Sequence, residues 1–497
     1  MKRAEAFSEF SEPQTMNDIY NRLYELGAIW REDHQYIVNA GQKNERIVTP
    51  LPEPRDIAKH LKSVCHFVFI GYGHVTDKSP LYLYDLDTGL YTASEDLFNR
   101  LCSKFDSRLK PRAWKDTLAF IRTSTNMKHP LESSTLIPVN NGIFDLKNKV
   151  LLDFSPKYII TSKIATSYNP EATKPILNGW FDFDKWLESI ACNDHEIITL
   201  LWQIMNEAIN PNRTRKKMVI LTGSGNNGKG TFQALLENLI GKSNISNLKP
   251  DQFGEKHLLS ALNGKVANIG DDITDKYMDS VSDLMSIVTG DTVQVNPKHA
   301  QPYEATYRLL CIFSGNGLPR SRNRTNGWYR RLCIVPFNAD FNGTIERPEI
   351  KDDFIKNKDL LEWILFNILN MPDFEKFIEP KAVMDILEDY KTDNDFYYSF
   401  VTTEYIPRGF HEIVHVPLPI AKEWLEEHVR NEGINNANLW GFGKKIVEAL
   451  NKVTNGNYEV KSGHVRLEDY DILDPMGFKK DILKSKPKGI RKMKLGD

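Results

Sequence analysis

The sequence lacks the features that mark membrane-spanning, secreted and metal-stapled proteins. None of its apolar runs approaches 18 residues, and the amino-terminal MKRAEAFSEFSEPQ has no apolar signal core. Its five cysteines form an odd set without a close pair, which argues against a disulfide framework and a zinc ribbon. We therefore expect a cytoplasmic protein without a membrane partner.

A strong excess of one charge is also missing. The formal net charge is −2, with 26% charged and 41% hydrophobic residues, which is an ordinary globular composition. Any binding of nucleic acid must therefore come from a local patch of positive charge. With 497 residues, the chain is too long for a single hydrophobic core, so we expect roughly two to four domains.

The most informative segment is VILTGSGNNGKGTFQALL, residues 219–236. It combines an apolar strand, a glycine-rich turn and an amphipathic helix, the layout of a loop that binds nucleoside triphosphates. Backbone N–H groups of such a loop cradle the phosphates, and its lysine neutralises the β and γ oxygens. The predicted ATP-binding residues are Gly223, Ser224, Gly225, Asn226, Asn227, Gly228, Lys229, Gly230 and Thr231.

Polar residues end two later strands. VANIGDDI, residues 266–273, ends in Asp271 and Asp272, an arrangement that suits a Mg²⁺ site with a neighbouring base. Two adjacent acids are also common in a solvated turn. RLLCIFSGN, residues 308–316, ends in Asn316, which can orient the attacking water or sense the γ-phosphate.

Two basic segments surround that strand. Residues 289–307 predict two short strands around a turn with Lys298 and His299, which suits contact with a DNA backbone but also fits a solvated turn. Residues 318–337 contain five arginines, which could form a basic loop on nucleic acid or supply an arginine finger to a neighbouring subunit. These arginines are Arg320, Arg322, Arg324, Arg330 and Arg331.

In this order, GSGNNGKGT, NIGDDI, TGD with a following lysine, IFSGN and GWYRRLCIVPF resemble the superfamily 3 helicase module of phage- and plasmid-encoded primase–helicases. The resemblance covers roughly residues 75–345. It implies an AAA+ core, a hexameric ring, and ATP-driven translocation on single-stranded DNA with unwinding of the duplex. If a phage encodes the protein, its location would be the host cytoplasm.

The resemblance also implies roles for single residues. Asp271 would hold Mg²⁺ through its shell, Asp272 would act as general base, and Asn316 as sensor. Lys298 and His299 would contact DNA. Arg331 is the first choice for the arginine finger, followed by Arg330 and, more remotely, Arg324. The chain departs from the family at Gly230, where Ser or Thr usually ligates Mg²⁺, so the phosphates, water and Asp271 would hold the metal.

The expected fold class is α/β, an AAA+ P-loop ATPase core with an α+β amino-terminal region and a carboxy-terminal winged-helix-like domain. Only about 70 residues precede the resemblance, and they lack a convincing metal-binding set of carboxylates, so we expect no primase activity. A primase partner would be a separate protein. The expected segments are 1–65, 66–195 (α+β), 196–345 (ATPase core), 346–395 (helical lid), 396–478 (winged-helix-like) and 479–497 (basic tail).

The winged-helix prediction rests on two helices, residues 419–431 and 440–452, followed by a two-stranded wing formed by NGNYEV and HVRL. Such a module could bind duplex DNA or act as a structural lid on the ring. The tail would add salt-sensitive affinity for DNA or remain merely solvated. Its basic residues are Lys479, Lys480, Lys484, Lys486, Lys488, Arg491, Lys492 and Lys494.

The leading functional hypothesis is an ATP-dependent replicative DNA helicase of a phage, plasmid or other mobile element. The alternative is an AAA+ replication initiator or helicase loader that binds origin DNA without unwinding it alone. A small-molecule kinase is a third reading, suggested by the Lys-Gly-Thr sequence at residues 229–231. The acids, the asparagine and the arginines downstream have no role in such a kinase.

Overall fold

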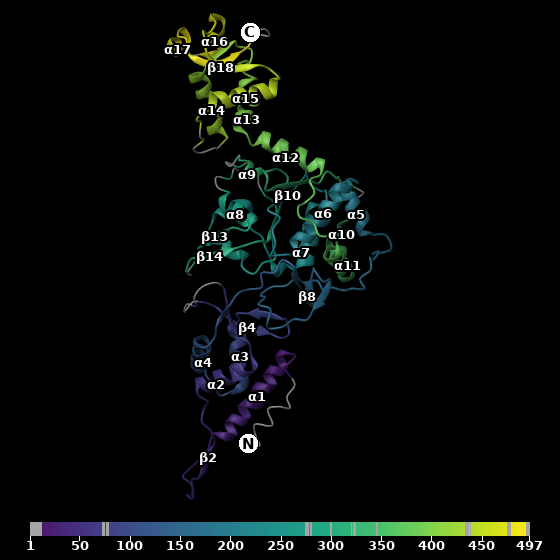
Figure 1. Ribbon diagram of the computed structural model, residues 1–497, viewed down its shortest axis with the longest axis vertical. Coiled ribbons are helices and arrows are strands. Elements are labelled where there is room, and N and C mark those ends of the chain that lie inside the picture. Colours follow the sequence, from purple (N-terminus) through teal and green to yellow (C-terminus); the bar gives the residue numbers. More distant parts are fainter. Residues whose placement is uncertain are drawn as a thin grey trace.

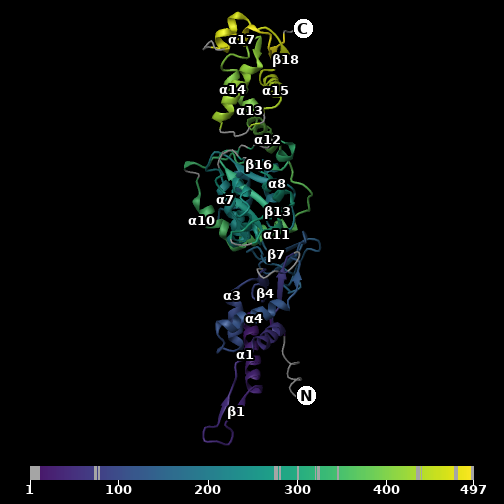
Figure 2. The ribbon, with the colours of Figure 1, turned by 90° about the vertical axis from the view of Figure 1, so that its left-hand side faces the viewer.

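The computed structural model describes residues 12–71, 75, 79–273, 278, 281–298, 301–319, 321, 325–343, 346–432, 437, 439–474 and 479–493. These residues form three lobes stacked along one long axis (Figures 1 and 2). The amino-terminal and carboxy-terminal lobes lie at opposite ends, and a larger central lobe separates them. Within this part of the chain, no helix is long and apolar enough to cross a membrane.

The amino-terminal lobe packs four helices against a four-stranded sheet of order β5-β4-β3-β6. Leu23, Leu61 and Leu101 are fully buried in one shared core. The predicted domain boundary at residue 65 therefore cuts through a single packed unit. The many charged residues in the first two helices made their apolar faces difficult to recognise in the sequence. The elements are α1 (Met16–Asp33), β1 (Tyr36–Val38), β2 (Arg46–Val48), α2 (Pro54–Val64), β3 (Phe67–Ile70), β4 (Leu81–Asp85), β5 (Leu90–Thr92), α3 (Glu95–Phe105), α4 (Pro111–Thr123) and β6 (Met127–Lys128).

Local turn chemistry shapes this lobe. The side chain of Asp85 accepts a hydrogen bond from the backbone N–H of Asp87 at 2.9 Å within the hairpin turn between β4 and β5. A capping box at Thr15 and Asp18 starts α1. The strands β1 and β2 pair as a hairpin that projects from the end of the lobe (Figure 1).

The segment that follows joins the central lobe. Its sheet β7-β8-β9 comprises Leu136–Val139, Gly142–Asp145 and Val150–Leu152, and helices α5 (Phe183–Ile190) and α6 (His195–Ala208) come next. Ile137, Phe144 and Phe183 share a core with Leu221. The core of the central lobe therefore begins to pack well before residue 196, the predicted boundary.

The central lobe is built on a parallel five-stranded sheet of order β11-β12-β15-β10-β16. Val219 and Leu221 face a core with α6, α7 and α11, whereas Met218 and Ile220 face a second core with α8, α9 and α12. Both faces are thus buried, which explains the continuous apolar strands. The strands are β10 (Met218–Thr222), β11 (Ile245–Ser246), β12 (Ala267–Gly270), β15 (Leu310–Gly315) and β16 (Leu332–Pro336); the helices are α7 (Lys229–Ile240), α8 (Ser282–Thr289), α9 (Asn326–Tyr329), α11 (Lys358–Asn370) and α12 (Lys381–Asp393).

The predicted basic hairpin is confirmed. β13 (Thr292–Val295) pairs antiparallel with β14 (Tyr303–Thr306), and Lys298 lies exposed in the connection. His299 lies outside the described residues.

Helix α12 carries the chain from the central to the carboxy-terminal lobe (Figure 1). Two hydrogen bonds fasten its end to the segment that follows β15. The Tyr390 hydroxyl donates to the carbonyl of Pro319 at 2.7 Å, and the backbone N–H of Ser321 donates to Asn394 Oδ1 at 2.7 Å. The helices α10 (Pro348–Asp352), α11 and α12 agree with the helical character predicted for residues 346–395.

The carboxy-terminal lobe has three strands in the order β17-β19-β18, and the predicted wing is wrong in its second strand. β18 pairs with Lys488–Lys492, not with HVRL, and Ile490 is 1% exposed. This basic segment is therefore the central strand of a sheet and not a free tail; Lys494 lies outside the described residues. The elements are α13 (Phe396–Phe400), β17 (His415–Pro417), α14 (Leu418–Asn431), α15 (Phe442–Thr454), β18 (Tyr458–Ser462), α16 (Tyr470–Leu473), α17 (Lys480–Lys484) and β19 (Lys488–Lys492).

Candidate functional site

The glycine-rich loop has the predicted strand–turn–helix geometry. β10 ends at Thr222, and α7 begins at Lys229. Gly228 caps the helix at φ +90°, and a Cβ there would lie 2.6 Å from Cγ2 of Ile190, so only glycine fits. The Asn227 side-chain amide donates to the carbonyl of Phe337 at 2.8 Å. This bond fastens the loop to the chain that leaves β16.

Lys229 is the buried cation of this loop. Its side chain is 7% exposed, and Nζ donates to the carbonyl of Gly223 at 2.6 Å and to Asn227 Oδ1 at 3.2 Å. Burial lowers the pKa of Lys229, and the nearby carboxylate of Asp271 opposes that shift. The ammonium therefore lies over the loop with a carboxylate within electrostatic reach.

Asp271 is oriented by its neighbours. The end of β12 lies beside the end of β15, so Ser314 donates its hydroxyl to Asp271 Oδ1, and the backbone N–H of Asp272 donates to the same oxygen at 2.8 Å. Asp272 adopts φ +50°, an uncommon conformation for a non-glycine residue, and both side chains are exposed. Among the described residues, no group of three or more His, Cys, Asp and Glu side chains could hold a metal.

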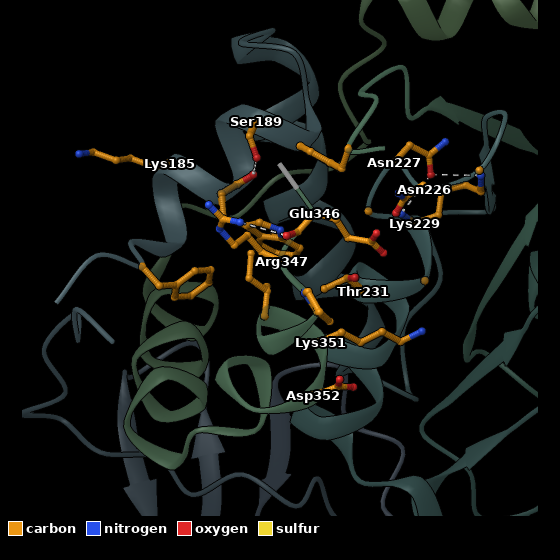
Figure 3. Close-up of a pocket in the computed structure, with 18 of the residues that line it drawn as sticks. Lys185, Ser189, Asn226, Asn227, Lys229, Thr231, Glu346, Arg347, Lys351 and Asp352 are labelled. Atoms are coloured by element: carbon orange, nitrogen blue, oxygen red, sulfur yellow. Dashed lines mark hydrogen bonds between the residues drawn. The ribbon is translucent and has the colours of Figure 1, made fainter. Parts of the chain in front are cut away.

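A cavity of about 720 Å³ opens beside the loop (Figure 3). Residues Gly225–Thr231 and Asn316 line it, whereas Asp271 and Asp272 are not among its lining residues. The remaining walls come from the start of α5 and from α10 (Pro348–Asp352), which sequence reasoning missed. These walls are Trp180, Phe181, Asp182, Lys185, Trp186, Ser189, Phe341, Glu346, Arg347, Pro348, Ile350, Lys351 and Asp352.

Two features of these walls bear on ligand chemistry. Trp180 is 47% exposed at the cavity edge, and its ring centroid lies 5.5 Å from that of Phe354. On the α10 side, Lys351 Nζ lies 3.4 Å from the place that a Cβ on Gly230 would take. Figure 3 shows Arg347, Lys351 and Thr231 around the same cavity. The signal for the aromatic wall was present in the sequence as WFDFDKW, residues 180–186.

The predicted arginines lie at the other end of the sheet. Because β10 and β16 run parallel, Arg330 and Arg331 precede the strand end that is opposite to the loop. Arg330 is exposed, whereas Arg331 is half-buried and donates through Nη1 to the carbonyl of Gly327. Arg320, Arg322 and Arg324 lie outside the described residues.

Two segments of the chain match known families. Residues 56–192 match the family described as D5 N terminal like, and residues 221–331 match a family of unknown function, DUF5906. The chain therefore contains two domains of the phage and viral primase–helicase type.

One viral protein and two solved structures are similar to parts of the chain. A putative helicase of Acanthamoeba polyphaga mimivirus, L207/L206, is 24% identical over 312 residues, which are 54% of this chain and 30% of the relative. The chain thus spans less than a third of that protein. The apo structure of the NrS-1 C-terminal region covers 83% of this chain and 97% of its own at 11% identity, with a TM-score of 0.48. A JCV helicase structure covers 42% of this chain and 60% of its own at 13% identity, with a TM-score of 0.26.

Proposed function

We propose that the chain is an ATP-dependent DNA helicase that works as a ring in the replication of a phage, plasmid or other mobile element. The observation that carries the proposal is the juxtaposition of a buried Lys229 with the large cavity at the start of α7. The oriented carboxylate of Asp271, which follows β12 at the same end of the sheet, supports it. Such a cradle binds phosphates through backbone N–H groups and neutralises them with the lysine.

The sheet order supports an AAA+ assignment within this proposal. The loop-bearing strand β10 lies between β15, which leads to Asn316, and β16, which follows the arginines. Asp271 leaves the next strand, β12. The predicted acid and the predicted sensor therefore leave the same edge of the sheet as the loop, where ligands of open parallel sheets bind.

In this proposal, the nucleotide binds in the cavity in one orientation. The phosphates would lie along Gly225–Thr231, and the base would lie against the aromatic wall at Trp180. Stacking on an exposed indole suits a purine ring. Arg347 and Lys351 would add positive charge on the side of α10.

The residues present fit a Mg²⁺ ion without the usual hydroxyl at position 230. Asp271 would hold it through water, and Thr231 lines the cavity one position later. The metal would neutralise charge on the β- and γ-phosphates. Asn316 would orient the attacking water, and the exposed carboxylate of Asp272 would accept its proton.

A neighbouring copy would complete the site. Arg330 and Arg331 precede the five-residue strand β16, which spans roughly 16 Å between them and the loop end of the sheet. They therefore cannot reach phosphates bound to their own loop. In a head-to-tail ring, each chain would present these arginines to the loop of the next, and six copies are the expected number. Lys298 on its hairpin would contact the DNA strand.

A forked duplex with one labelled strand tests the proposal. A helicase displaces that strand when ATP and Mg²⁺ are added, and displacement stops with a non-hydrolysable analogue. Binding of the fork without displacement would contradict the proposal and support the second candidate, an initiator or helicase loader. Gly230 and the compact carboxy-terminal lobe with its central basic strand favour that candidate.

A further inference from the structure

Helix α2 carries a stripe of positive charge. Arg55, Lys59 and Lys62 recur at spacings of four and three residues, so they lie on one helix face, and all three are exposed. Ile57, Ala58 and Leu61 on the opposite face are buried in the core of the amino-terminal lobe. The stripe extends about 10 Å along the helix.

The stripe leads into a cleft. Lys62 Nζ donates to the carbonyl and the hydroxyl of Ser124 at 2.6 and 2.8 Å, which places this end of α2 against the end of α4. Lys62 also lines an open cleft of about 380 Å³ together with Lys128 and Lys157. No carboxylate is among the described residues that line the cleft.

The histidine of the cleft adds no charge at neutral pH. Burial lowers the pKa of His66, and Lys128 lowers it further, while Glu12 opposes both effects. The positive charge of the cleft therefore comes from its three lysines.

An aromatic ring lies beside the stripe. Phe120 of α4 is 41% exposed, and the guanidinium carbon of Arg55 lies 5.8 Å from its ring centroid. The acids nearest in sequence are Glu53, which is exposed at the start of α2, Asp56, which is half-buried, and Asp116, which is exposed one turn earlier on α4. An exposed ring among cations is the combination that single-stranded nucleic acid uses, because its bases are free to stack.

The stripe and the basic hairpin lie on the same side of the molecule. In Figure 1, α2, α4, β13 and β14 lie along the left-hand side, and Figure 2 shows α4 and β13 on the side that faces the viewer.

We propose that this surface, the amino-terminal track, is a second binding site for single-stranded DNA. The track consists of Arg55, Lys59, Lys62, Lys128, Lys157 and Phe120. Its cations contact the phosphates, and Phe120 stacks on an unpaired base. The track goes beyond the proposed function, which places DNA only at Lys298, and it guides the strand that passes the hairpin along the outside of the amino-terminal lobe.

The test measures binding of a fluorescent oligothymidine to the full chain by anisotropy, without nucleotide and over a range of salt concentrations. The variant is Arg55→Gln/Lys59→Gln/Lys128→Gln; Lys62 is left in place because it holds α4. Binding should weaken at least about tenfold, and the slope of log affinity against log salt should fall by about 2, since three phosphate contacts are lost. The matched control, Lys43→Gln/Lys104→Gln/Lys110→Gln, removes equal charge from exposed positions of the same lobe and should bind like the wild type.

Phe120→Ala tests the preference for a single strand. It should weaken oligothymidine binding about fivefold and leave duplex binding unchanged, whereas Phe120→Tyr should retain affinity. Wild-type affinity of the triple variant would overturn the track. Equal losses on single-stranded and duplex DNA with a silent Phe120→Ala, or tighter binding of oligouridine than of oligothymidine, would also overturn it. Failure of the proposed helicase would appear separately, as absence of strand displacement by the wild type.

Discussion

The two ends of the central sheet have opposite character. At the carboxyl end, the glycine-rich backbone and a buried lysine line the cavity, and the oriented carboxylate of Asp271 lies outside its lining. At the amino end, Arg330 is exposed, and Arg331 is half-buried and donates to the carbonyl of Gly327. Along one chain, the phosphate cradle and the cations expected to complete it are therefore separated by the length of the sheet.

In the proposed mechanism, this separation means that two chains contribute to each ATP site. A loop that is complete in itself would need no second copy. Among the described residues, the one arginine that lines the cavity is Arg347, which precedes α10. The two ends of the sheet therefore differ in whether their cations act on ATP bound to the same chain or on ATP bound to a neighbouring chain.

The largest effect should come from the carboxyl end. Lys229→Ala removes the buried ammonium, so ATP hydrolysis should fall about 100-fold or more, and strand displacement should stop. Thermal stability should not fall, because a partly desolvated charge is removed. Lys242→Ala, an exposed lysine at the far end of α7, is the control. Wild-type hydrolysis by Lys229→Ala would remove the loop from the site.

The next largest effect should come from the amino end. Arg330→Ala and Arg331→Ala should each lose most ATP hydrolysis, but Arg331→Ala should also unfold at a lower temperature because its bond to Gly327 is lost. When Arg330→Ala is mixed equally with Lys229→Ala, intact sites should form at about a quarter of the interfaces if chains assemble at random head to tail. A mixture that hydrolyses no ATP would show that each site lies within one chain.

A smaller effect should come from the magnesium site. Gly230→Ser restores the usual hydroxyl, and the nearest atom to the new Cβ is the mobile Lys351 Nζ at 3.4 Å, so the substitution has room. The Mg²⁺ concentration for half-maximal ATP hydrolysis should fall about fivefold, which corresponds to one added ligand contact of about 1 kcal/mol. Gly230→Ala controls for the backbone, and an equal shift in both variants would contradict the role of the hydroxyl.

The smallest effect should be a change of pH dependence. The pKa of Lys229 is lowered from 10.5, and only the protonated form attracts phosphate. Affinity for ADP should therefore fall as the pH rises, with a midpoint below that of an ordinary lysine. Titration between about pH 7 and 10 measures this, and Lys229→Arg should give a flat profile because arginine stays charged. A flat wild-type profile would show that Lys229 does not contact the phosphates.

The features predicted well from the sequence are those fixed by a few consecutive residues. The loop at Gly223–Lys229 and the hairpin around Lys298 each have local spacing or turn chemistry that specifies them. The order of the strands followed from no residue pattern, because it depends on crossovers. The walls of the cavity were missed for a similar reason, since α5 and α10 come from segments more than 150 residues apart.

The strand β19 was not predicted because its residues are not typical of a β-strand. KGIRK has one apolar side chain, Ile490, and four residues that favour solvent or turns. Its place in the sheet depends on the partners β17 and β18, which bury Ile490 opposite Val416 and Val460. The basic residues that suggested a solvated tail lie towards the two ends of that strand. The charge composition alone therefore predicted the wrong structure for this segment.

The bonds at the end of α12 give the molecule a mechanical linkage. Pro319 and Ser321 follow Asn316 by a few residues, and both are clamped to Tyr390 and Asn394, where the carboxy-terminal lobe begins. A small shift of Asn316 would be amplified by the roughly 20 Å length of α12 into a swing of the whole lobe. These two hydrogen bonds would thus convert a small movement near Asn316 into a larger movement of the carboxy-terminal lobe.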